Sequence, residues 1–100
     1  MTHYSMSIED AYRQKKAAQL KEWGAQIDLF EARAENAGAD IVIMRAKELE
    51  TLRARHKAAS QKMQDLETAT GQAWEQVKET ADKIWDELKD GVAEARAKFK

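Results

Sequence analysis

The chain has 100 residues, of which 35% are charged and 43% are hydrophobic, a mixture typical of coiled coils and other long-helix proteins. Cysteine is absent, which excludes disulfides, thiol nucleophiles and zinc-thiolate sites and fits a reducing compartment. The formal net charge is −1, and neither a signal-like start nor an apolar run of bilayer length is evident. We therefore expect one small, cytoplasmic domain.

The chain should begin with a flexible segment, residues 1–7, followed by a long helix from Ile8. Ser7 offers a hydroxyl that can cap the first turn, and Glu9 and Asp10 suit the positive end of the helix dipole. Apolar residues then recur at steps of three and four, which predicts a helical seam through Leu20, Trp23, Ile27, Phe30, Ala34, Ala37, Ile41 and Met44. A second seam, one residue out of frame, runs through Leu49, Leu52, His56, Ala59, Met63 and Leu66.

Two glycines could interrupt this helix. The first seam keeps its frame across Gly38, and one glycine inside a helix costs only about 1 kcal/mol. We therefore predict a helix over 8–68, a turn over 69–71 near Thr70 and Gly71, and a second helix over 72–99. The resulting fold is an all-α antiparallel coiled-coil hairpin in a single domain, 8–100. The alternative is a three-helix bundle that also turns at 36–40, with Gly38 as C-cap and Asp40 as the next N-cap.

The last arm repeats itself every eleven residues, which is almost three whole helical turns, so repeated positions stack on one face. Apolar residues form a stripe on that face, Lys78 and Lys89 flank it, and acids lie opposite. Such a stripe fits either packing against the rest of the chain or binding to a lipid surface or an unfolded client protein. Its residues are Trp74, Val77, Ile84, Trp85, Leu88, Val92 and Phe99.

The two arms of the predicted hairpin differ in length, so half of the first seam would lack a partner within the chain. An apolar seam of this size is not left in water. We therefore expect self-association, most simply as an antiparallel homodimer, through Leu20, Trp23, Ile27, Phe30, Ile41 and Met44. Another protein could also cover this seam.

Charge is unevenly distributed, with +4 over 45–62 between segments of −2 and −3. The bases Arg53, Arg55 and Lys57 lack interleaved aromatic residues and match no nucleic-acid motif, so nucleic-acid binding is not expected. If the chain reverses near Thr70, these bases would meet acids of the last arm, which favours antiparallel pairing. The acids concerned are Asp82, Asp86 and Glu87.

No catalytic or metal-binding pattern can be picked out. His3 and His56 have no second histidine or cysteine at ligand spacing, and the acids fall on solvated helix faces rather than in a pocket. His56 lies on the second seam, where a packing or interface role is expected, with a pH-responsive contact as the sharper alternative. We expect no enzyme activity, no metal and no cofactor.

Three segments carry a resemblance to known proteins: Leu20-Lys21-Glu22-Trp23-Gly24-Ala25-Gln26-Ile27, Gly71-Gln72-Ala73-Trp74-Glu75-Gln76-Val77-Lys78 and Trp85-Asp86-Glu87-Leu88-Lys89. With these, most of the chain resembles short bacterial coiled-coil proteins of mostly uncharacterised function. The arm over 73–100 is also similar to the eleven-residue repeats of exchangeable apolipoproteins and late-embryogenesis-abundant proteins. These resemblances imply a bacterial helical protein and transfer no catalytic residue. The expected function is a self-associating scaffold or adaptor, and the alternative is a peripheral membrane or stress-protective protein.

Overall fold

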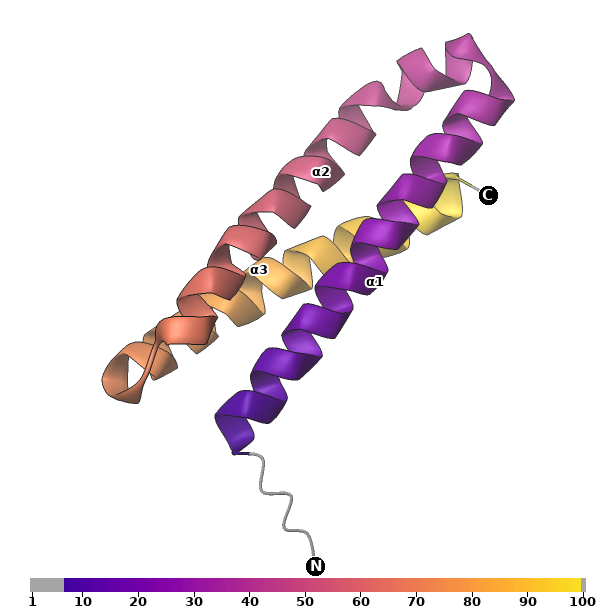
Figure 1. The fold of residues 1–100 in the computed structure, drawn as a ribbon. Helices are drawn as coiled ribbons and strands as arrows, with labels where there is room; N and C mark the ends of the chain where they lie inside the picture. Colours follow the sequence, from indigo (N-terminus) through magenta and orange to yellow (C-terminus); the bar gives the residue numbers. More distant parts are fainter. Residues whose placement is uncertain (1–6, 100) are drawn as a thin grey trace, which may run out of the picture.

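A computed structural model describes residues 7–99. This part of the chain folds into three helices, α1 (Ile8–Ala37), α2 (Ala39–Thr68) and α3 (Gly71–Lys98). Helices α1 and α2 form an antiparallel hairpin, and α3 passes behind both of them in Figure 1. The predicted all-α class is confirmed. The two-helix hairpin is wrong in its helix count, whereas the alternative three-helix bundle fits.

The predicted continuous helix over 8–68 breaks at Gly38. This residue has φ 113° and ψ 167°, a region of backbone conformation that is open essentially to glycine alone. Its N–H donates to the carbonyl of Glu35 at the end of α1, and its own carbonyl accepts from Ile41 and Val42 at the start of α2. Gly38 therefore closes one helix and opens the next, while Asp40 lies in the first turn of α2 rather than at its N-cap.

A continuous helix was predicted because the first seam was extended past Gly38 to two apolar residues. Continuity across Gly38 depended on Ile41 and Met44, yet the side chain of Met44 is 62% exposed and Ile41 is only partly buried. Counted back from Leu49 in steps of seven, the seam of α2 passes through Val42, which, like Ile41, is partly buried and packs against the core. The frame slip between Met44 and Leu49 therefore belongs to a new helix with its own buried face.

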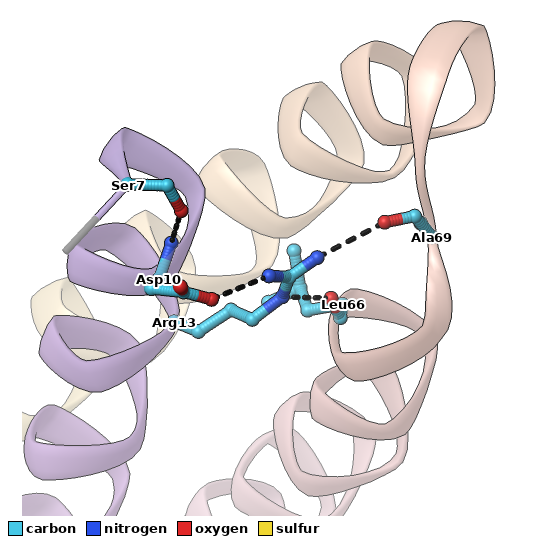
Figure 2. A network of polar contacts seen from close by, with 5 residues as sticks. All are labelled: Ser7, Asp10, Arg13, Leu66 and Ala69. Atoms are coloured by element: carbon cyan, nitrogen blue, oxygen red, sulfur yellow. Dashed lines mark hydrogen bonds and ion pairs between the residues drawn. The ribbon is translucent and has the colours of Figure 1, made fainter. Parts of the chain in front are cut away.

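The second turn lies at Ala69 and Thr70, so α3 begins at Gly71, within the predicted turn. The carbonyls at the end of α2 are capped by an arginine of α1. Arg13 donates from Nε to the carbonyl of Leu66 at 2.6 Å and from Nη2 to that of Ala69 at 3.0 Å, as Figure 2 shows. Its guanidinium also lies 4.7 Å from the centre of the Trp74 ring. Arg13 thus satisfies carbonyls that have no partner inside their own helix and ties α1 to the α2–α3 turn.

At the start of α1, Ser7 accepts from the backbone N–H of Asp10 at 3.1 Å, as the capping pattern predicts. Asp10 in turn pairs with Arg13 at 3.0 Å, so the cap of α1 and the cap of α2 are connected (Figure 2). The remainder of the segment predicted to be flexible, residues 1–6, lies outside the described residues, and so does His3.

The core runs along the length of the bundle between the three helices. Ile27 and Phe30 of α1, Leu66 of α2 and Trp85 and Leu88 of α3 are each at most 1% exposed. At the end of α3, Phe30 of α1 stacks on Phe99 with ring centres 5.4 Å apart, and Arg33 donates to the Phe99 carbonyl at 2.9 Å. These contacts hold the end of α3 against α1.

Candidate interaction surface

The seam predicted for self-association lies mostly inside the single chain. Leu20, Trp23, Ile27 and Phe30 are all at most 8% exposed, because α2 and α3 cover them. The helices contain 30, 30 and 28 residues, so the length mismatch that called for a second chain does not exist. Of the six seam residues, Met44 alone belongs to the exposed surface. Any self-association must therefore use a different face.

The stripe of α3 is also internal. Trp74, Trp85, Leu88, Val92 and Phe99 are each at most 6% exposed, while Val77 and Ile84 are partly buried against the core. The indole N–H of Trp85 donates to the carbonyl of Lys16 at 3.2 Å. In this fold the stripe faces α1 and α2, so contact with lipid or with an unfolded client through these residues requires α3 to leave the bundle.

A polar cluster fixes α3 beside the start of α1. The hydroxyl of Tyr12 donates to Asp82 at 2.5 Å, and Lys16 forms an ion pair with the same carboxylate at 3.2 Å. Burial alone would raise the pKa of Asp82, but the hydrogen bonds from Tyr12 and Lys16 and the charges of Lys16 and Lys78 outweigh it and hold this pKa below its usual value. Burial, and then the contact with Asp82, raise the pKa of Tyr12. The cluster ties α3 to the start of α1, and Asp82 also lines an open hollow on the surface of α3.

The charge pairing expected between α2 and α3 is wrong. Arg53 does not meet the acids of α3; its Nη2 lies 2.7 Å from Asp28 and 3.4 Å from Glu31, both of α1. Asp82 is engaged by Lys16 and Tyr12, as described above. The cause is the break at Gly38, which brings α1 alongside α2 and supplies acids to the face of α2 where Arg53 lies.

His56 has a packing role. Its Nε2 lies 2.9 Å from the carbonyl of Leu20; because a carbonyl can only accept, Nε2 carries the proton in this contact. The ring sits against Gly24, where an added Cβ would lie 2.9 Å from Nε2. The absence of a side chain at Gly24 leaves the space that the His56 ring of α2 fills, and this allows the two helices to approach closely.

After the core closes, large apolar side chains remain exposed at the tip of the hairpin. Ile43 is 75% exposed and Met44 is 62% exposed, on neighbouring positions of the first turns of α2. The frame slip that follows Met44 was a signal of this surface, although Met44 itself was assigned to the first seam. Ile43 was missed because it belongs to neither seam.

Beside this tip, α1 and α2 leave an open groove that α3 does not reach. Its lining residues come from α1 and α2 alone, with apolar side chains at the bottom and charged ones along the edges. They are Ala34, Val42, Ala46 and Leu49 at the bottom and Glu31, Glu35, Glu50 and Arg53 at the edges. The view in Figure 1 looks onto this side of the hairpin, with α3 behind it. We call it the α1–α2 face.

A second groove, between α2 and α3, differs in character. Lys98 reaches across it to Glu48 at 3.2 Å, and Arg55 lies over Gly91, where an added Cβ would be 2.9 Å from Nη1. Charges of both signs line this groove, with Lys47, Arg55 and Lys98 beside Glu48 and Glu94. It joins the two helices rather than offering a surface of one sign.

Residues 7–99 contain no group of three or more His, Cys, Asp or Glu side chains placed to hold a metal ion. In the same part of the chain, no helix combines the length and the apolar character needed to cross a bilayer. Comparisons with protein-family models, with curated proteins and with solved structures found no match for this chain.

Proposed function

We propose that this chain is a non-enzymatic helical module that associates with itself and serves as a scaffold or adaptor. The observation that carries the proposal is the uncovered apolar tip, Ile43 and Met44, next to the open groove between α1 and α2. Four large apolar side chains are exposed among the described residues; Ile43 and Met44 are neighbours, whereas Ile8 and Leu29 lie apart from each other on α1. Localised apolar surface beside a groove marks an interaction site.

Full burial of one isoleucine or methionine side chain is worth roughly 1.5–3 kcal/mol, and two such residues contribute in each of two copies. Exposed at the end of a bundle that has already buried its core, they do not stabilise the fold of the single chain. Their contribution is therefore available to association.

Sedimentation velocity over a concentration series tests the proposal. The wild-type chain is expected to form dimers in the micromolar range, and the double substitution Ile43→Lys with Met44→Lys is expected to weaken association about tenfold or more. Ala58→Lys is the control, since Ala58 is also exposed on α2 but does not line the groove. A wild-type chain that stays strictly monomeric up to about 100 µM would rule the proposal out.

A further inference from the structure

We propose that the α1–α2 face docks onto the same face of a second copy, with the two chains antiparallel and related by a twofold axis at the level of Arg53 and Asp28. This inference rests on the proposed function and adds the surface, the partner and the register. It is carried by the pattern of charges on that face.

Several exposed charged residues of α1 and α2 form no ion pair with other described residues, and four of them share the heptad frame of Asp28 or Ile43: Lys21 and Glu35 of α1, and Glu50 and Lys57 of α2. Within each helix they follow the heptad spacing. Lys21, Asp28 and Glu35 are seven residues apart, and so are Ile43, Glu50 and Lys57. Because seven residues return a helix to nearly the same face, each set forms one stripe. The acids lie toward the tip of the hairpin and the bases lie toward its middle.

Both stripes have their midpoint at the same level of the hairpin. Asp28 is midway between Lys21 and Glu35, and Arg53 is next to the midpoint between Glu50 and Lys57. These two central residues form an ion pair with each other at 2.7 Å. The two charge patterns, on different helices, therefore share one centre, as a single twofold axis requires.

A twofold interface places the same patch of both copies in contact. An axis that lies between the two faces and perpendicular to the helices sets α1 against α1 and α2 against α2, each pair antiparallel. Glu50 then lies opposite Lys57 of the second copy, and Glu35 lies opposite Lys21. Every one of these charges meets its opposite, whereas a parallel arrangement would place like charges together, which costs free energy.

The negative charge of Asp28, at the centre of the proposed interface, is already balanced within each copy. Asp28 of one copy would face Asp28 of the other near the axis, but Arg53 already pairs with Asp28 and, at 3.4 Å, with Glu31. The groove supplies the apolar part of the contact. Lysine stems can lie along apolar surface while their ammonium groups reach an acid, and the bottom of the groove between Glu35 and Glu50 is apolar. Lys21 and Lys57 of the second copy fit this description.

Charge-reversed variants test the register. Lys21→Glu with Lys57→Glu makes the face acidic, and Glu35→Lys with Glu50→Lys makes it basic. Each variant alone is expected to dimerise at least about tenfold more weakly than wild type, and an equimolar mixture is expected to form a heterodimer at least as tight as the wild-type homodimer. Sedimentation velocity with one variant carrying a fluorescent label reports all three cases.

The matched control is Glu79→Lys with Asp90→Lys, which makes the same change in charge on exposed positions of α3 and should leave dimerisation within about twofold. Far-ultraviolet circular dichroism verifies that each variant is folded. The single substitutions Lys57→Glu and Glu50→Lys repeat the mixing test with half the change in charge. A wild-type dimer with no recovery in the mixture overturns the antiparallel register but not self-association. A monomeric wild-type chain overturns both the register and self-association, and the partner of the α1–α2 face would then be a different protein.

Discussion

Single residues decide how closely the helices of this bundle approach. Gly24 lies in the middle of α1, where glycine normally weakens a helix, yet its missing side chain makes room for the ring of His56. Gly91 plays the same part in α3, where an added Cβ would lie 3.0 Å from Leu52 and 2.9 Å from Arg55. These glycines are therefore packing residues rather than hinges.

Substitution of Gly24 tests this interpretation. In an unobstructed helix, Gly→Ala stabilises by roughly 1 kcal/mol, but here the new methyl group would collide with His56, and we expect Gly24→Ala to destabilise the fold by about 1–2 kcal/mol. In a His56→Ala background the same substitution should instead stabilise. Urea unfolding of the four chains gives the complete cycle. If Gly24→Ala proves stabilising with His56 present, the two helices do not touch there.

Asp82 gives the fold an acid-sensitive contact. Its pKa is held below the usual value by Tyr12 and Lys16, so its contribution to stability is fully present above the unfolded-state pKa and disappears as pH falls through the lower, folded-state pKa. We expect Asp82→Asn to cost about 1 kcal/mol at pH 7, and this difference should shrink toward zero near pH 2. Urea unfolding at both pH values measures it, and Asp90→Asn, at an exposed position, should show no such pH dependence. An Asp82→Asn cost that is equally large at both pH values would contradict an ionic role.

At the scale of the helix, much of the structure follows from sequence patterns. The spacing of Leu49, Leu52, Ala59 and Leu66 identified the buried face of α2, and Ser7 and Gly71 marked a start and a turn where the structure has them. The break at Gly38 was predicted only as an alternative, because the local pattern was compatible with both conformations. The choice depends on tertiary contacts, since α1 can cover α2 only if the chain reverses there. Nor could spacing reveal that Arg13 would cap the end of α2, a contact between residues 53 positions apart or more.

Gly38→Ala separates the two helical arrangements. If the helix continued through this position, alanine would stabilise it by roughly 1 kcal/mol. In the observed turn, φ of 113° is strained for any residue with a Cβ, although an added Cβ would meet no atom within 4 Å. We therefore expect a loss of about 1–3 kcal/mol from backbone conformation alone, measured by urea unfolding. A gain in stability from Gly38→Ala would contradict the three-helix bundle.

At the scale of the whole molecule, the three helices bury most of their apolar side chains against one another and leave one side of the α1–α2 hairpin uncovered. Most of the predicted association seam and of the predicted lipid stripe lies in or against the core, so the surface that is left for function is the one that α3 does not cover. The sequence contains the residues of that surface, but only the fold shows that Glu35 of α1 and Glu50 of α2 line one groove, and the heptad spacing adds Lys21 and Lys57 to the proposed face. The arrangement of these charges is the basis for proposing that the bundle associates with itself.

The most direct test of this account is the distance between equivalent residues in the two copies, measured by pulsed dipolar spectroscopy. The chain has no cysteine, so one spin label can be attached at Ala54→Cys, next to the proposed axis, or at Gln64→Cys, ten residues further along α2. At about 1.5 Å per residue, an antiparallel pair separates the two Gln64 positions by roughly 30 Å along the helices and leaves the Ala54 positions nearly level. We therefore expect a short distance for Ala54→Cys and a clearly longer one for Gln64→Cys; equal short distances at both positions, or no coupling at all, would contradict the antiparallel dimer.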